Sequence, residues 1–190
     1  MNFLKDTEQY DYLMKLIILG KDFTGKSSFL KRIKSYDNYK SFRKFTAIYF
    51  PTIGIDFGII CIQYNNKIFK FRIWDLSGQE RYGAIIKSYY IPANYILIFY
   101  DALDKESFKK AKVYYEEALN ANNKAIYFLI RSKYDSISNL HNNKIVSDEE
   151  ALKFADKNNL IFAHISSFEK EENGINEVFE IIMKIEYKKS

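Results

Sequence analysis

Short apolar runs alternate with amphipathic segments along most of the chain. Runs of strand length, rich in Ile, Leu, Phe and Tyr, predict buried β-strands. Between and after them lie stretches whose apolar residues recur at helical spacing, which predicts helices packed on the strands. The predicted strands are 14–19, the two arms of 54–76, 95–101, 125–132 and 160–167, and the predicted helices are 26–35, 105–121, 147–159 and 174–189.

Local sequence signals support several of these elements. Asn65–Asn66 lies between the two arms of 54–76 and is typical of a tight hairpin turn. Ser147 or Asp148 followed by Glu150 is typical of a helix N-terminus, because a side-chain oxygen there accepts a hydrogen bond from a free backbone amide.

The alternation of strands and helices predicts an α/β fold. We expect a six-stranded, mainly parallel sheet with one antiparallel strand from the hairpin, covered by helices on both faces. In such sheets, ligands bind beyond the carboxyl ends of the strands. The loops after these strands therefore converge on one rim, where we look for chemistry.

The first of these loops, GKDFTGKS, runs from Gly20 to Ser27 and fits the spacing G-x-x-x-x-G-K-[ST]. Backbone amides of such a loop surround phosphate groups, and the helix that follows adds its positive N-terminus. Lys26 would neutralise the phosphates and Ser27 would give its hydroxyl to Mg²⁺. A helix entry that only happens to contain G-K-S is the alternative, but the position between a strand and a helix favours the phosphate site.

A second motif, WDLSGQE at 74–80, fits D-x-x-G at the end of a strand. Asp75 would hold a Mg²⁺-bound water, and the Gly78 amide would meet the terminal phosphate. Gln79 would orient the attacking water. The motif is common by itself, and the phosphate loop upstream makes it informative.

Composition excludes several other classes of protein. The chain has 190 residues, of which 47% are hydrophobic and 28% charged, which suits one globular domain. Its one cysteine, Cys61, rules out an intrachain disulfide and a cysteine-based metal site, and we interpret it as a packing residue in a reducing compartment. The net charge of +5 gives no indication of nucleic-acid binding. We interpret His141 and His164 as structural or surface residues.

Taken together, the motifs resemble a known family. The phosphate loop, PTIGIDF at 51–57, FRIWDLSGQERY at 71–82 and SYYIPANYILIFYD at 88–101 resemble Ras-superfamily small GTPases, most closely the Rab branch. The resemblance covers residues 14–187. It implies a P-loop GTPase domain over that range, preceded by an N-terminal extension, 1–13, and followed by a short end, 188–190.

The resemblance also implies roles for individual residues. Thr52 would be the switch threonine that ligates Mg²⁺ with Ser27 and Asp75, and Gln79 would be the catalytic residue. Phe57, Trp74 and Tyr89 match the aromatic triad that Rab proteins present to effectors, although core and edge packing would also explain these rings. The implied nucleotide-binding residues are Asp22, Thr24, Gly25, Lys26, Ser27, Ser28, Thr52, Gly78, Ser132, Lys133, Asp135, Ser166, Ser167 and Phe168.

The guanine end departs from the family pattern N-K-x-D. Asp135 can still accept hydrogen bonds from guanine, which would exclude adenine, and the stem of Lys133 can still cover the ring. Ser132 replaces the usual Asn and would weaken the tie to the phosphate loop, at a cost of about 1–3 kcal/mol. In the last base loop, Ser167 can supply the backbone amide, with Phe168 in place of a Lys. Tyr39 or Asn38 falls where the family has an aromatic residue flanking the base.

Asp22 and Phe23 stand where small GTPases usually carry small residues, near the terminal phosphate and the incoming arginine finger. We expect them to crowd the finger and Gln79, which would give slow hydrolysis that responds poorly to an activating protein. Alternatively, both side chains point to solvent.

Two further departures concern the switch region and the tail. The segment from Tyr39 to Thr52 is longer than in typical Rab proteins, and either a longer effector switch or a tolerated insertion explains it. The sequence ends EYKKS with no cysteine after Cys61. We expect either that a prenylated tail is missing from the chain or that the protein has no such anchor, so that membrane binding depends on that tail.

The resemblance thus implies a cytoplasmic, monomeric GTP/GDP switch that acts at the cytosolic face of an endomembrane in vesicle and protein transport. Its cofactor would be Mg²⁺, and its partners would be effectors, an exchange factor and an activating protein, with no nucleic acid. The alternatives are a nucleotide-binding adaptor with little turnover and a Ran-like transport GTPase.

Overall fold

The computed structural model describes residues 2–4, 6–34, 54–76, 88–133, 146–167 and 174–189. Four helices and seven strands lie within these ranges. The strands are β1 (Asn2–Leu4), β2 (Tyr12–Gly20), β3 (Ile55–Tyr64), β4 (Lys67–Leu76), β5 (Tyr95–Asp101), β6 (Ile126–Ser132) and β7 (Ile161–Ile165). The helices are α1 (Lys26–Lys34), α3 (Lys105–Ala121), α4 (Asp148–Lys157) and α5 (Ile175–Lys189).

The strands form one sheet in the order β1-β3-β4-β2-β5-β6-β7. β2 lies in the middle and pairs in parallel with β4 on one side and β5 on the other. β3 pairs antiparallel with β4, as expected of a hairpin. The α/β fold with a mainly parallel sheet is therefore confirmed, and all six strands expected from the sequence are present.

The sheet has a seventh strand that the hydrophobic pattern does not predict. β1 pairs antiparallel with the far end of β3, where Phe3 is opposite Ile62. Because β3 itself runs against the rest of the sheet, β1 runs with the others and β3 remains the one reversed strand. A three-residue strand carries too little periodicity to be recognised from sequence. The boundary between the N-terminal extension, 1–13, and the domain that begins at residue 14 remains a prediction.

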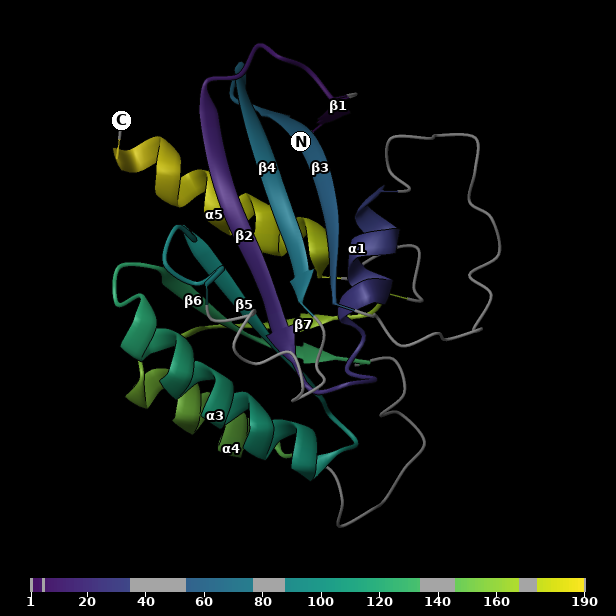
Figure 1. Ribbon diagram of the computed structural model, residues 1–190, viewed down its shortest axis with the longest axis vertical. Helices are drawn as coiled ribbons and strands as arrows, with labels where there is room; N and C mark the ends of the chain where they lie inside the picture. Colours follow the sequence, from purple (N-terminus) through teal and green to yellow (C-terminus); the bar gives the residue numbers. More distant parts are fainter. Residues whose placement is uncertain are drawn as a thin grey trace.

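Helices cover both faces of the sheet (Figure 1). On one face, α1 and α5 pack on the strands through Phe29 and Phe179, whose rings are stacked with centroids 6.2 Å apart. On the other face, α3 and α4 cover β5 and β6 through a core that includes Phe108 and Tyr115. The long apolar runs of the sequence are buried because both faces of the central strands are covered.

The local turn and cap signals are confirmed. Asn65 and Asn66 have φ of 49° and 59°, the left-handed conformation that a two-residue hairpin turn requires. Ser147 caps α4 by accepting a 3.1 Å hydrogen bond from the amide of Glu150. Cys61 is fully buried in β3, in agreement with a packing role.

The strand register brings the expected loops together. Gly20 is opposite Phe99 across β2 and β5, Asp101 is opposite Ser132, and Ser132 is opposite Ile165. The carboxyl ends of β2, β5, β6 and β7 thus lie in one row. This row is the rim on which a nucleotide site was expected.

Candidate nucleotide-binding site

The loop between β2 and α1 is a tight turn that its own side chains hold closed. Gly20 has φ of 147°, and a Cβ there would lie 2.5 Å from the carbonyl oxygen of Phe99, so only glycine fits. Thr24 is buried, and its hydroxyl donates to the carbonyl of Lys21 over 2.7 Å. Gly25 also has a positive φ, of 88°. The G-x-x-x-x-G spacing therefore corresponds to two backbone positions that favour glycine.

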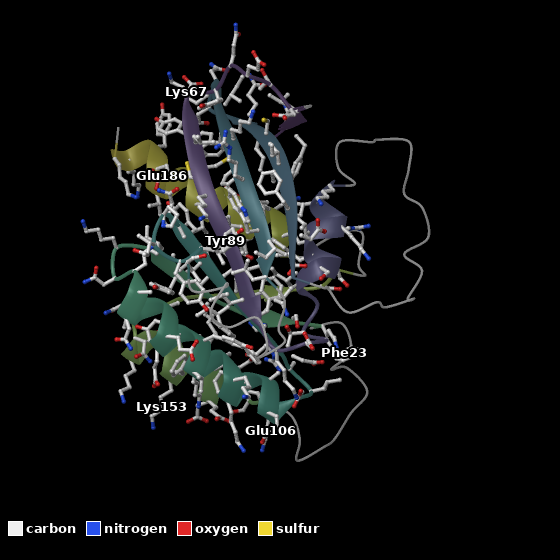
Figure 2. The ribbon with its side chains drawn as sticks, viewed as in Figure 1. Phe23, Lys67, Tyr89, Glu106, Lys153 and Glu186 are labelled. Atoms are coloured by element: carbon white, nitrogen blue, oxygen red, sulfur yellow. The ribbon has the colours of Figure 1, made fainter. Side chains whose placement is uncertain are left out.

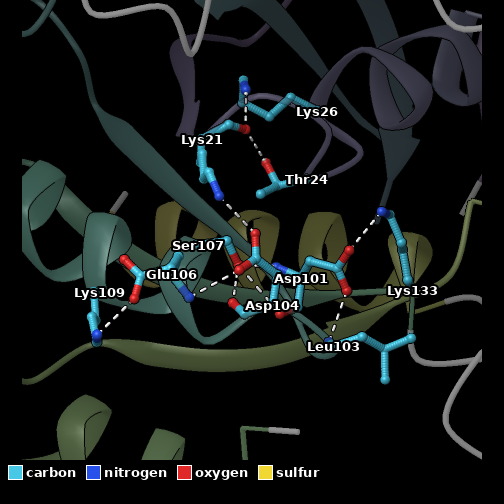
Figure 3. Close-up of polar contacts among 10 residues, drawn as sticks. All are labelled: Lys21, Thr24, Lys26, Asp101, Leu103, Asp104, Glu106, Ser107, Lys109 and Lys133. Carbon is cyan, nitrogen blue, oxygen red and sulfur yellow. Dashed lines mark hydrogen bonds and ion pairs between the residues drawn. The ribbon is translucent and has the colours of Figure 1, made fainter. Parts of the chain in front are cut away.

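Lys26 is folded back over this loop. Its ammonium donates to the carbonyl of Gly20 over 2.7 Å. It also donates to the carbonyl of Lys21 over 2.9 Å (Figure 3). Burial lowers the pKa of Lys26, while the charges of Asp75 and Asp22 act in the opposite direction. A buried cation surrounded by carbonyls lacks a full counter-charge, which is the setting in which a phosphate binds strongly.

Ser27 and Asp75 meet beside Lys26. The Ser27 hydroxyl donates to Oδ2 of Asp75 over 2.5 Å. Asp75 is fully buried at the end of β4, and among the described residues its other oxygen, Oδ1, has no hydrogen-bond partner. Burial raises the pKa of Asp75, whereas Ser27 and Lys26 lower it. A buried carboxylate with an unpartnered oxygen is costly unless a cation joins it.

These two side chains fit a magnesium ion. A hydroxyl and a carboxylate oxygen are ligands of the type Mg²⁺ takes, and Mg²⁺ typically uses one or two carboxylates together with substrate phosphates and waters. The part of the chain that the structure describes has no cluster of three or more His, Cys, Asp or Glu side chains, so no all-protein cage competes with this site there. Thr52, the third expected ligand, lies outside the described residues.

Lys21 connects the loop to α3. Its side chain forms a 2.9 Å ion pair with Oδ2 of Asp104, which is the N-cap of α3 and accepts from the amide of Glu106 (Figure 3). Burial raises the pKa of Asp104, but the Lys21 contact and backbone amides outweigh it and the pKa is lowered. Sequence reasoning missed this pair. Its only signals were the Lys directly after Gly20 and an Asp preceding a helix.

The base end of the rim is partly described. The Ser132 hydroxyl donates to the carbonyl of Tyr100 over 2.9 Å. A Cβ placed on Gly25 would lie 3.7 Å from the Cβ of Ser132, so Ser132 lies against the phosphate loop. Lys133 has φ of 57° and forms a 2.6 Å ion pair with Asp101 (Figure 3). These contacts place Ser132 beside the phosphate loop and Lys133 beside Asp101 at the end of β5. Their roles in nucleotide binding stay a prediction.

The remaining expected residues fall into two groups. Ser28 is half-buried in the first turn of α1, and Ser166 and Ser167 follow directly after β7, with Ser166 buried. His164 lies in β7, as expected of a strand residue. Gly78, Gln79, Asp135 and Phe168, together with Asn38, Tyr39 and His141, lie outside the described residues.

Asp22 and Phe23 differ in their placement. Phe23 is 59% exposed and has φ of 67°, an unusual conformation for a bulky residue (Figure 2). Asp22 is half-buried, and its charge acts on Lys26. The solvent-facing alternative therefore suits Phe23 better than Asp22.

The expected aromatic triad is assembled on the sheet. Phe57 is opposite Trp74 across β3 and β4, with ring centroids 4.7 Å apart. Trp74 and Tyr89 are both half-buried, whereas Phe57 is 41% exposed. The side chain of Lys15 in β2 extends over the rings of Trp74 and Tyr89. Its Nζ lies 4.8 Å from the Trp74 ring centroid and 5.2 Å from the Tyr89 ring centroid. No local pattern in the sequence connects Lys15 with these rings.

The fold and the phosphate-loop geometry define a P-loop protein, and comparison with known proteins identifies the family. The model of the Ras family matches residues 15–188, so the chain belongs to the Ras family of small GTPases. Relatives place it in the Rab branch. It is 36% identical to the GTP-binding protein YPT1 of Saccharomyces cerevisiae, over 85% of this chain and 73% of the relative. It is also 36% identical to the GTP-binding protein YPTM2 of Zea mays and to the Ras-related protein RABD2b of Arabidopsis thaliana, over 90% of this chain and 78% and 79% of the two relatives.

No described helix has the combination of length and hydrophobicity that crossing a bilayer requires.

Proposed function

We propose that this Rab-branch GTPase is a GTP/GDP switch that depends on Mg²⁺. One observation carries the proposal: Ser27 and the unpartnered, buried oxygen of Asp75 lie beside a buried Lys26 on a glycine-bounded loop. Lys26 would exchange its two carbonyl partners for phosphate oxygens. When bound, Mg²⁺ would neutralise charge on the phosphates, and Ser27 and Asp75 would hold it there.

The two states of the switch would differ in the terminal phosphate. With GTP bound, Thr52 and the Gly78 amide would contact that phosphate and order the segments around them, and hydrolysis would release these segments. Effectors, an exchange factor and an activating protein would distinguish the two states. Gln79 would orient the attacking water, and Asp135, Lys133 and Ser167 would recognise guanine.

Nucleotide titration tests this proposal. Nucleotide-free protein is titrated with GTP, GDP and ATP, each in Mg²⁺ and in chelator. We expect both guanine nucleotides to bind at least about 100-fold more tightly than ATP, because adenine leaves the base-reading groups unpaired. Asp75→Asn should lose most of the Mg²⁺ dependence. Asp11→Asn, which changes a carboxylate paired with Lys67 at the other end of the sheet, is the matched control. Equal affinity for GTP and ATP would refute the proposal.

We also propose that hydrolysis is slow and responds weakly to an activating protein. Asp22 supports this, because a half-buried carboxylate close to Lys26 adds negative charge where the phosphate and an arginine finger would meet. An arginine finger contributes about 10³–10⁵ in rate, so obstruction there outweighs a modest loss of affinity.

Single-turnover GTP hydrolysis with and without a Rab-type activating protein is the measurement. We expect the activating protein to accelerate the double variant Asp22→Gly, Phe23→Gly far more than the wild type. The single variant Phe23→Gly separates the two positions, and we expect it to stay close to the wild type because Phe23 is largely exposed. Strong acceleration of the unaltered protein would contradict the proposal.

We propose a cytoplasmic role in vesicle-mediated protein transport, at the cytosolic face of an endomembrane, which membership of the Rab branch supports. Depletion of the protein should slow delivery of a secreted reporter, with rescue by the wild type and not by Asp75→Asn. Normal delivery after depletion would argue for a different process.

The alternative is an adaptor that binds nucleotide with little turnover. Ser132 favours it, because its hydroxyl is engaged by Tyr100 and is therefore poorly placed to hold the phosphate loop as well. The hydrolysis experiment also decides here: bound GTP that persists in both the wild type and the double variant would identify the adaptor.

A further inference from the structure

The two ends of the segment between β6 and α4 meet at one point of the sheet. Residues 134–145 lie outside the described ranges, but Lys133 before them and Val146 after them are described. The Val146 amide donates to the carbonyl of Ala102 over 3.0 Å, and the Ala102 amide donates to the carbonyl of Ser132 over 3.5 Å. All three of these residues are buried. The chain therefore leaves the sheet and returns to it beside the end of β5.

Arg131 of β6 holds the returning end. Its side chain is buried, and its guanidinium donates to the carbonyl of Val146 over 3.4 Å. The same guanidinium forms an ion pair with Asp148, the first residue of α4. A planar guanidinium carries several donors and can serve both acceptors at once. One side chain thus connects β6 to the start of α4.

This connection differs from the exposed ion pairs of the surface. Burying a guanidinium costs free energy unless an opposite charge and further acceptors compensate it, which Asp148 and Val146 do here. Removing one partner of a buried pair is strongly disruptive, whereas an exposed pair contributes little. We therefore expect the position of Val146 relative to β6 to depend on the pair between Arg131 and Asp148.

The residues assigned to guanine recognition lie directly beside this connection in the chain. Lys133 and Asp135 follow Arg131 by two and four positions. The hydroxyl of Ser132 is engaged by the carbonyl of Tyr100, so it gives the base end little support from the phosphate loop. A segment that is held at both ends has fewer conformations to lose on binding, which preorganises the groups it carries.

We propose that Arg131 is a positioning residue for guanine recognition. By fixing Val146 and Asp148 at the far end of the segment, it holds Asp135 where that carboxylate accepts from the exocyclic amino group of guanine. Arg131 is itself buried and would not touch the nucleotide. The inference rests on the proposed function, in which Asp135 reads the base.

The test changes Asp148 instead of Arg131, because the Asp148 side chain is 54% exposed and its replacement leaves no cavity in the core. GDP and inosine diphosphate, which lacks the exocyclic amino group, are titrated in Mg²⁺ into the nucleotide-free full chain. The wild type should prefer GDP by at least about tenfold, because inosine diphosphate leaves the carboxylate one hydrogen bond short. Asp148→Ala should reduce this preference to below about threefold, through weaker binding of GDP.

Two further variants separate positioning from a general loss of stability. Asp148→Glu keeps a carboxylate for Arg131 and should restore most of the preference for GDP. Glu150→Ala removes another acidic side chain from the first turn of α4, one that pairs with Lys112 over 3.5 Å, and should keep the preference of the wild type. Urea unfolding of all the variants measures the loss of stability separately.

The outcomes distinguish this inference from the proposed function. A wild type that prefers GDP, together with an Asp148→Ala variant that keeps the full preference, would overturn the inference alone. Equal weakening of GDP and inosine diphosphate by Asp148→Ala would also overturn it, because a merely structural role predicts that result. An equal effect of Glu150→Ala would assign the change to the charge of the α4 N-terminus instead. A wild type that binds both nucleotides equally would refute base reading by Asp135, and the inference with it.

Discussion

At the scale of single residues, the site departs from the motifs of the small-GTPase family at three positions, and each departure has a different physical consequence. Phe23 adopts a left-handed conformation that costs a non-glycine residue roughly 1 kcal/mol, yet its ring is largely exposed. Asp22 acts through its charge on Lys26. Ser132 acts through its length, because its hydroxyl reaches the carbonyl of Tyr100 while its Cβ lies beside Gly25.

Ser132→Asn should strengthen nucleotide binding. The longer amide side chain would reach the phosphate loop that Ser132 only touches, and hydrogen bonds worth about 1–3 kcal/mol would slow GDP release by roughly tenfold. Stopped-flow release of a fluorescent GDP measures this. Ser132→Ala, which removes the hydroxyl and adds no reach, should not slow release. If a stably folded Ser132→Asn released GDP at the wild-type rate, serine would not be the weak point of the site.

At the scale of elements, the sequence predicted most of the architecture. The hairpin turn at Asn65–Asn66 and the Ser147 cap depend on contacts between residues close in sequence, so their patterns are informative. The strand over 95–101 is recognisable because it is one continuous apolar run. β1 was not predicted, because its pairing with β3 joins residues about sixty positions apart.

We expect the N-terminus of α3 to contribute both to the stability of the folded protein and to the retention of bound GDP. Asp104 caps the helix and also holds Lys21 of the phosphate loop. Asp104→Ala should lower the free energy of unfolding by about 1 kcal/mol through the lost cap. It should also speed GDP release by about two- to fivefold through the lost ion pair, which is partly exposed and therefore weak.

Two variants separate these effects. Asp104→Asn keeps a good cap and should change release alone. Ser147→Ala removes the cap of α4 and should lower stability alone. Urea unfolding and GDP release are measured on all three proteins. Wild-type release by Asp104→Asn would show that the Lys21 pair does not steady the loop.

At the scale of the whole molecule, the packing of β6, β7 and α4 creates a titratable position that the sequence did not indicate. His164 lies beside Phe162, with ring centroids 4.8 Å apart. Burial lowers the pKa of His164, and the charge of Arg131 lowers it further, against an opposing effect of Glu177. Arg131 is itself buried and paired with Asp148.

The lowered pKa of His164 makes stability depend on pH. Because the folded state holds this proton less tightly than the unfolded chain, the free energy of unfolding falls as pH drops below about 6.5, the ordinary histidine value. The loss is complete once pH is below the folded pKa. Above about 6.5 the residue is neutral in both states and contributes nothing.

Urea unfolding between pH 7.5 and 5 measures this effect. His164→Gln cannot take up the proton, so its stability should decline less on acidification than that of the wild type. Curves that run parallel over the whole range would show that His164 does not contribute.

The sequence alone predicted the order of the elements other than β1, located the phosphate loop, and singled out Ser27 and Asp75, whose side chains the structure brings together. These depend on periodicity over a few residues and on a motif whose glycines are required by the backbone itself, at Gly20 and Gly25. Only the tertiary structure decided that Lys21 meets Asp104 and that Lys15 lies over Trp74. Those facts follow from strand order and register, which bring distant residues together and leave no trace in the local pattern of the chain.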